Sequence, residues 1–140
     1  MKFIVLLLVG MAAAFLRVEH SNGSELEKAL EGSFAKDGKV FIILFYTNKG
    51  DDIKDKNNEY RDALKEYVFK DNPTLYYTEV NVDDEDYEYF AHSIIGVTEE
   101  EVQDSPSILI INEGVGDLVH GPEAVKRIAG KVPVFNEVAS

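Results

Sequence analysis

The feature of this sequence that most constrains its fold is a continuous apolar run at positions 40–46, Val-Phe-Ile-Ile-Leu-Phe-Tyr. The length of the run and its β-branched and aromatic content favour a β-strand that is covered on both faces. Such a strand lies in the middle of an α/β sheet, with helices packed on each side of it. The rest of the chain must therefore supply those helices and the neighbouring strands.

Segments with helical spacing alternate with further apolar segments along the chain. Helices are predicted to begin at about residues 24, 54, 83 and 122, and the last of them is expected to end at Gly130. Strands are predicted over residues 75–82, 107–111 and 117–120, with a hairpin turn between the last two. The side chains expected to face the core from the second and third helices are Tyr60, Ala63, Leu64, Tyr67, Val68, Tyr87, Phe90, Ala91 and Ile94.

The order of these elements predicts an α/β fold. Strands that are separated by helices pair in parallel through crossovers, and the final hairpin adds antiparallel pairing. We therefore expect a mixed four- to five-stranded sheet with helices on both faces. A Ser24-Glu25-Leu26-Glu27 pattern, typical of a capping box, is expected to open the first helix.

The first 14 residues have the pattern of a signal peptide. Lys2 precedes an apolar stretch, and small residues follow at positions 12–14. The stretch ends at residue 16 and is shorter than the roughly 20 residues of a membrane span. We expect a secretory-pathway protein, either resident in the endoplasmic reticulum lumen or secreted. A short membrane anchor and a mitochondrial targeting segment are the alternatives.

The expected division of the chain follows from that leader. Residues 1–14 form the cleaved signal peptide, 15–23 an N-terminal segment, 24–130 the folded domain and 131–140 a C-terminal tail. Asn22-Gly23-Ser24 is an acceptor pattern for N-glycosylation, which is consistent with the same compartment. The alternative interpretation is that Asn22 and Gly23 simply form a turn.

The charge of the chain limits its partners. Asp and Glu number 26 against 14 Lys and Arg, which gives a formal net charge of −12. Such a surface repels nucleic acid phosphates and anionic lipid headgroups, so we expect neither as a partner and no membrane insertion of the mature chain. A protein or peptide partner is expected instead.

Four motifs resemble the thioredoxin fold in their order and spacing. They are the strand ending at Tyr46, the helix from about Lys54, the Val80-Asn81-Val82-Asp83 strand end, and Ser105-Pro106 before an apolar strand. The connector from Ile95 to Glu101 is longer than in thioredoxin and is similar to that of the redox-inactive b-type domains of protein disulfide isomerases. The resemblance implies a thioredoxin-like fold and a protein-binding role.

The chain departs from that family in its chemistry. The sequence contains no cysteine, and the position of the redox motif reads Gly50-Asp51-Asp52-Ile53. Leu44 stands where the family buries an acid, and Glu79 where a lysine often partners that acid. We therefore expect no thiol–disulfide exchange, no enzyme activity and no cofactor.

A peptide-binding surface is expected at the vacant redox edge. The resemblance implies contacts from Tyr46, Ile53, Ser105 and Pro106, with Ile53 exposed and the Ser105–Pro106 bond cis. The polar residues 47–52 would form the rim of this surface. The alternative is that these side chains simply fill one edge of the core.

Acidic clusters suggest a weaker possibility, calcium binding. The candidate ligands are Asp83, Asp84, Glu85, Asp86, Glu99, Glu100 and Glu101. Calcium takes six to eight oxygen ligands, and these segments could provide some of them. The alternative is a solvated helix start, where acids interact favourably with the helix dipole.

The three histidines, His20, His92 and His120, lie far apart and do not have the spacing of a zinc site.

The sequence thus favours a redox-inactive thioredoxin-like module that binds proteins in the secretory pathway, as a chaperone-like or scaffolding factor. A low-affinity acidic calcium-binding protein and an accessory subunit of a larger assembly remain as alternatives.

Overall fold

The computed structural model describes residues 15–31 and 39–139. Five strands form one sheet in the order β1-β3-β2-β4-β5. Their bounds are β1 Leu16–Arg17, β2 Phe41–Tyr46, β3 Tyr76–Asn81, β4 Ser107–Asn112 and β5 Val115–His120. β1, β3 and β2 are parallel, whereas β4 and β5 run antiparallel to their neighbours. The mixed four- to five-stranded sheet expected from the sequence is confirmed.

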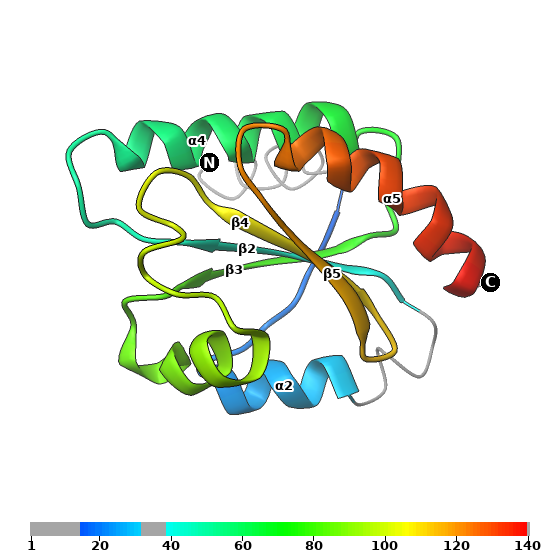
Figure 1. Ribbon diagram of the computed structural model, residues 1–140. Helices are drawn as coiled ribbons and strands as arrows, with labels where there is room; N and C mark the ends of the chain where they lie inside the picture. The colour runs from blue at the N-terminus through cyan, green and yellow to red at the C-terminus, as the bar shows by residue number, and fades with distance from the viewer. Residues whose placement is uncertain (1–14, 32–38, 140) are drawn as a thin grey trace, which may run out of the picture.

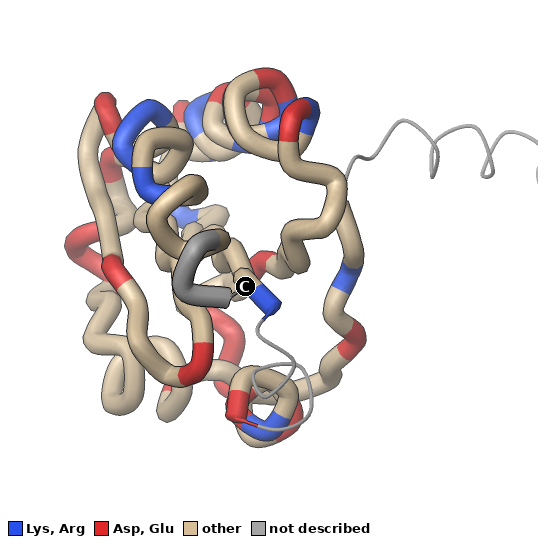
Figure 2. The backbone as a smooth tube through the Cα atoms, turned by 90° about the vertical axis from the view of Figure 1, so that its right-hand side faces the viewer, with Lys and Arg blue, Asp and Glu red and all other residues tan. Residues whose placement is uncertain are grey.

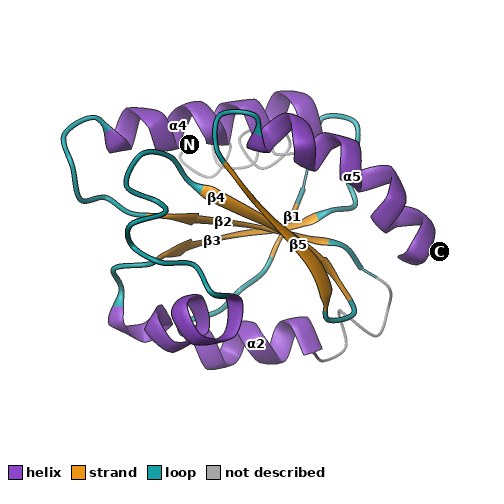
Figure 3. Ribbon diagram, in the orientation of Figure 1, coloured by secondary structure: helices purple, strands orange, loops and turns teal. Residues whose placement is uncertain are grey.

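Helices cover both faces of this sheet (Figure 1). One face carries α2 (Gly23–Glu31), the short η2 (Glu85–Tyr87) and η3 (Tyr89–Ile95), and the other carries α4 (Ile53–Leu64), η1 (Lys65–Phe69) and α5 (Ala124–Ala139). The elements form three layers, with the strands between the two groups of helices (Figure 3). The β2 strand is the centre of this arrangement, and its first five residues are buried.

Two apolar clusters, one on each face of the sheet, form the core. Alternate β2 residues enter alternate clusters, because successive strand side chains point to opposite faces. Ile42 and Leu44 join the cluster under α4 and α5, while Ile43 and Phe45 join the cluster under α2 and η3. The double burial explains why the run at 40–46 is continuously apolar.

Two π-helical turns alter the expected pattern of buried side chains. In η1 the N–H of Lys70 donates to the carbonyl of Lys65 (3.0 Å), so this turn is wider than an α-helical turn. Phe69 is therefore buried at 1% exposure, whereas Tyr67, predicted to face the core, is 55% exposed. The prediction for Tyr67 is wrong because it assumed a period of 3.6 residues throughout.

The η3 turn, on the other face of the sheet, is also π-helical and also changes which side chains are buried. The Gly96 N–H donates to the carbonyl of Ala91 (2.9 Å), again five residues back. Phe90 and Ala91 are buried as predicted, but Ile94 is 39% exposed. Ile95 packs against the core in its place. The assignment of Ile94 to the core is therefore wrong for the same reason.

The cap of α2 lies two residues earlier than the sequence pattern indicated. Asn22 Oδ1 accepts from the N–H of Glu25 (2.9 Å), and a Glu25 carboxylate oxygen accepts from the N–H of Ser21 (3.3 Å). The capping arrangement therefore uses the side chains of Asn22 and Glu25, rather than those of Ser24 and Glu27. Gly23 is required here, since a Cβ on it would lie 2.7 Å from the Cβ of Phe90.

The last helix is longer than expected. α5 continues through Gly130 to Ala139 and contains Pro133. Val132 is buried and Phe135 packs against the core under α5. The predicted helix end at Gly130 is wrong because these apolar side chains extend the packed face, so residues 131–139 are helix rather than tail.

The β4–β5 hairpin has the expected turn. Glu113 and Gly114 connect the strands with φ angles of 52° and 82°. Positive φ at both loop residues matches the twist of a two-residue hairpin.

Within the described residues, no helix has the length and apolar character needed to cross a membrane. The predicted signal peptide lies outside the described residues.

Candidate functional site

The candidate site lies where β2 ends and α4 begins. Residues 47–52 connect these two elements, and residues 103–104 approach them from the segment that precedes β4. Gly50 adopts a φ of 130° within this connection, a conformation that other residues rarely adopt. This is the edge of the sheet at which the sequence predicted a binding surface.

A shallow pocket of about 180 Å³ marks this edge. We call it the loop pocket, and its lining residues are Gly50, Asp51, Asp52, Ile53, Lys56, Gln103 and Asp104. Three carboxylates thus surround it against one ammonium group. The Lys56 ammonium also lies 3.2 Å from the Glu59 carboxylate, which balances its charge. The loop pocket therefore has an acidic rim.

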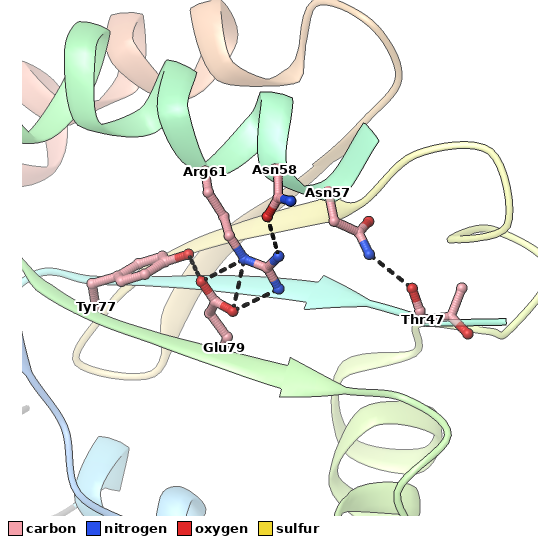
Figure 4. A network of polar contacts seen from close by, with 6 residues as sticks. All are labelled: Thr47, Asn57, Asn58, Arg61, Tyr77 and Glu79. Atoms are coloured by element: carbon pink, nitrogen blue, oxygen red, sulfur yellow. Dashed lines mark hydrogen bonds and ion pairs between the residues drawn. The ribbon is translucent and has the colours of Figure 1, made fainter. Parts of the chain in front are cut away.

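Polar contacts hold the loop in place behind the pocket. The Thr47 hydroxyl donates to the carboxylate of Asp83, at the end of β3, and accepts from the N–H of Lys49 (3.1 Å). The Asn57 side chain, fully buried in α4, donates to the Thr47 carbonyl (2.8 Å; Figure 4). Buried polar groups need such partners to offset the loss of water. These contacts connect the first turns of α4 to the ends of both central strands.

The predicted contact residues are less exposed than expected. Ile53 is only 4% exposed and Ser105 7%, and Pro106 is also buried. The expectation that Ile53 offers an exposed apolar surface is therefore wrong. Its side chain is buried at the first position of α4, where it lines the loop pocket. Of the four residues, Tyr46 is the most accessible and is half-buried.

The Ser105–Pro106 bond also differs from the prediction. It is trans, as are the other described peptide bonds. The trans form is the lower-energy state of an X–Pro bond. With this bond trans, Ser107 pairs directly with Phe45 at the start of β4. The expected cis proline is therefore wrong, although the register does bring Pro106 next to the end of β2.

A second polar network lies farther back under α4 (Figure 4). The Arg61 guanidinium contacts both carboxylate oxygens of Glu79, with Nε at 3.0 Å from each and Nη2 at 2.9 Å from one. The Tyr77 hydroxyl donates to the same carboxylate (2.6 Å). The guanidinium also lies 4.8 Å from the centre of the Tyr46 ring, as in a cation–π contact.

This network changes the chemistry of Tyr77. Burial raises the pKa of its hydroxyl well above 10.0, and the charge and hydrogen bond of Glu79 add to that effect. Arg61 and Arg17 act in the opposite direction. A tyrosine hydroxyl is protonated at neutral pH even at its ordinary pKa, and here it serves as a donor to Glu79.

Three of the seven acids proposed as calcium ligands, Asp83, Asp84 and Glu101, have separate local partners. Asp83 accepts from Thr47 and lies 3.6 Å from the Lys49 ammonium, while Asp84 accepts from the N–H of Asp86 (2.9 Å). Glu101 contacts the Thr98 hydroxyl (3.3 Å). Over residues 15–31 and 39–139, no group of three or more Asp, Glu, His or Cys side chains is arranged to hold a metal ion.

Two of the three histidines, His20 and His120, contact hydroxyl groups. His20 lies between Tyr87 (Nδ1 to Oη, 2.7 Å) and Thr78, and so connects the N-terminal segment to β3 and η2. His120 lies 2.9 Å from the Ser107 hydroxyl across the β4–β5 pair. Burial lowers the pKa of His20 below 6.5, although Glu19 and Glu25 partly oppose this effect.

Solved structures with a similar arrangement include thioredoxins. Thioredoxin O2 from Arabidopsis thaliana matches with a TM-score of 0.58 and 14% identity, over 88% of this chain and 96% of that one. Thioredoxin from Trypanosoma brucei brucei matches with a TM-score of 0.59 and 8% identity, over 90% of this chain and 94% of that one. No family model and no curated protein match the sequence.

A fragment of ERdj5, the J-Trx1 fragment, is a further structural neighbour. It matches with a TM-score of 0.56 and 15% identity over 89% of this chain, which spans 52% of that fragment. The predicted thioredoxin-like fold is therefore confirmed. The narrower resemblance to b-type domains remains a prediction.

Proposed function

We propose that this chain is a redox-inactive protein-binding module that captures an extended, basic segment of a partner at the loop pocket. The observation that carries the proposal is the acidic rim of the loop pocket on a thioredoxin-like fold. Asp51, Asp52 and Asp104 lie together there at a site where the chain has no cysteine. A redox function would need a thiolate at this position.

The shape and charge of the pocket favour a basic side chain as its ligand. The pocket is open and shallow, so the carboxylates that surround it remain hydrated and available. An arginine can bind carboxylates through several donors at once. Ile53 closes the floor of the pocket from within, so the complex is expected to depend on rim charges more than on apolar burial.

The secretory location is part of the same proposal. It rests on the pattern of residues 1–14 and on the Asn22 acceptor site. N-terminal sequencing of native material should find a chain that begins near Phe15. An intact Met1 on the native protein would contradict the location without affecting the binding proposal.

A direct test uses two labelled extended peptides. One carries two arginines, and in the other glutamates replace them. The arginine peptide should bind the full chain, as measured by fluorescence anisotropy, and the glutamate peptide should not. Changing Asp51→Asn, Asp52→Asn and Asp104→Asn together should weaken binding by about tenfold or more, because three rim charges are lost. Asn at position 52 is still a good helix N-cap residue.

The matched control removes the same charge elsewhere. Asp62→Asn, Glu66→Gln and Asp71→Asn change three exposed acids outside the loop pocket. This control should bind the arginine peptide almost as well as the wild type. Equal losses in both triple variants would show only a long-range charge effect. That result would overturn the assignment of binding to the loop pocket.

A further inference from the structure

A second pocket lies on the α4 face of the sheet, next to the β1 edge. It has a volume of about 180 Å³ and is lined from three segments of the chain. β1 and the residue before it contribute Phe15 and Arg17, and β3 contributes Tyr77 and Glu79. The α4–η1 helical segment contributes the remaining residues, Arg61, Lys65 and Phe69. We call it the aromatic–cation pocket.

The spacing in each segment explains why these side chains meet. Residues two apart on a strand share one face, as do residues about four apart on a helix. Phe15 and Arg17 follow the first rule, as do Tyr77 and Glu79. Arg17 and Tyr77 are also partners in the parallel β1–β3 register. The residues at 61, 65 and 69 follow the second rule and face the strands.

Aromatic rings form the apolar wall of this pocket. The Phe15 ring lies 4.9 Å from the Phe69 ring and 5.0 Å from the Tyr77 ring, measured between centroids. The Phe69 and Tyr77 rings are also 4.9 Å apart. For scale, an apolar protein cavity of about 150 Å³ holds one benzene molecule. The volume here therefore suits one six-membered ring and a small substituent.

The charges at the pocket are unbalanced. The Glu79 carboxylate is already satisfied by Arg61 and by the Tyr77 hydroxyl. Arg17 and Lys65 are exposed, and neither forms an ion pair with another described residue. Two unneutralised cations thus flank an aromatic wall in a chain whose net charge is −12. Figure 2 shows acidic residues on several sides of the same molecule.

We propose that the aromatic–cation pocket binds a carboxylate carried on an aromatic body, with the ring against Phe15 and the accessible edge of Tyr77, and the carboxylate between Arg17 and Lys65. Such a ligand complements both halves of the pocket, since cations make charge-assisted hydrogen bonds to carboxylates and aromatic rings pack edge to face. The ligand is either a free aryl carboxylate or the C-terminal carboxylate of a chain that ends in an aromatic residue. This site is separate from the loop pocket, so either proposal can fail alone.

The test compares charged and neutral probes on the full chain. 3-Phenylpropionate should shift the NMR amide signals of Arg17, Lys65 and Tyr77, with a saturable response. The neutral 3-phenylpropanamide, which has the same ring, should bind about tenfold more weakly or worse. Equal binding of the two probes, shifts that map elsewhere, or no shifts would overturn the proposal. This comparison needs no variant and so does not depend on the folding of one.

A pair of charge-matched variants locates the site. Arg17→Gln with Lys65→Gln should reduce 3-phenylpropionate binding by about tenfold. Lys54→Gln with Arg127→Gln removes two exposed cations outside the pocket and should leave binding unchanged. An equal loss in both double variants would overturn the assignment.

Two short peptides distinguish the sources of the carboxylate. One ends in phenylalanine with a free carboxylate, and the other carries a C-terminal amide. If the free-acid peptide binds more tightly than 3-phenylpropionate, the site recognises a chain terminus. If it binds more weakly, the site takes a free aryl carboxylate. Binding of the amide peptide as tight as that of the free acid would contradict carboxylate recognition in either form.

Discussion

The Arg61 guanidinium and the Glu79 carboxylate form an ion pair between α4 and β3, with three contacts of 2.9 to 3.0 Å. Glu79 is the register partner of Leu44 on β2. At the position where the family resemblance implied a buried acid, this chain therefore has an apolar side chain. The acid of this register pair is Glu79 on β3, and it is paired with Arg61. The arrangement connects the α4 helix to the sheet through Glu79.

This ion pair should contribute measurably to stability. Both side chains are about one-quarter exposed, so the pair is less screened than a surface pair. Glu79→Gln should lower the free energy of unfolding by about 1–3 kcal/mol, because Arg61 and Tyr77 lose a charged partner. Urea denaturation measures the change. Glu59→Gln, which breaks the exposed pair with Lys56, should cost less than about 0.5 kcal/mol; a larger loss there than at Glu79 would contradict this view.

Replacement of Ile53 by a charged residue should destabilise the fold. Ile53 is 4% exposed, so an Asp at this position would place an unpaired carboxylate in the core. We expect Ile53→Asp to cost about 3 kcal/mol or more, as measured by thermal or urea unfolding. Ile53→Val should cost only about 0.5–1.5 kcal/mol. If Ile53→Asp unfolds like the wild type, the side chain is at the surface after all.

The contribution of His20 to stability should fall between pH 7.5 and pH 5.5. Burial lowers the pKa of its imidazole below 6.5, so the unfolded chain binds the proton more readily. The stability that the neutral ring contributes is fully present above pH 6.5. It is lost as the pH falls from 6.5 through the lowered pKa of the folded state. His20→Asn should therefore show a smaller loss between pH 7.5 and pH 5.5 than the wild type in urea titrations. An equal change in stability with pH in the wild type and in His20→Asn would contradict this role of His20.

Calcium should not stabilise the chain through the acids at 83–86 and 99–101. Asp83, Asp84 and Glu101 already have local partners. Titration with calcium to about 5 mM, above the weak range of extracellular sites, should give neither saturable heat nor a shift in melting temperature. A saturable response that disappears in Glu99→Gln with Glu100→Gln would restore the calcium-binding alternative.

The sheet could be predicted from the sequence because its signals are strong and local. The apolar run at 40–46 and the Glu113-Gly114 turn each allow few structures. The side chains buried by the helices were harder to predict. A period of 3.6 residues predicts Tyr67 and Ile94 in the core. Each lies within a turn closed by a π-type hydrogen bond, and this turn shifts the buried position. Tertiary packing selects such turns, and the sequence pattern does not reveal them.

The polar contacts were the least predictable part of the candidate site. The sequence pattern identified Leu44 and Glu79 as departures from the family, but it gave no partner for Glu79. Arg61 lies 18 positions away on another element and is brought to Glu79 only by the packing of α4 on the sheet. The i, i+4, i+8 spacing of residues 61, 65 and 69 was a usable signal for the aromatic–cation pocket. The resemblance implied an open redox edge with Ile53 exposed, whereas its side chain is buried here.

The most direct test of the central claim is an NMR titration of the full chain with the arginine-bearing extended peptide. The acidic rim predicts saturable shifts of the amide signals at residues 50–53 and 103–104, and no comparable shifts on the β1 edge. Added salt should weaken these shifts, because the contacts at the rim are largely electrostatic. Shifts that map to another face, or a peptide that binds equally well when its arginines are replaced by glutamates, would contradict protein capture at the loop pocket.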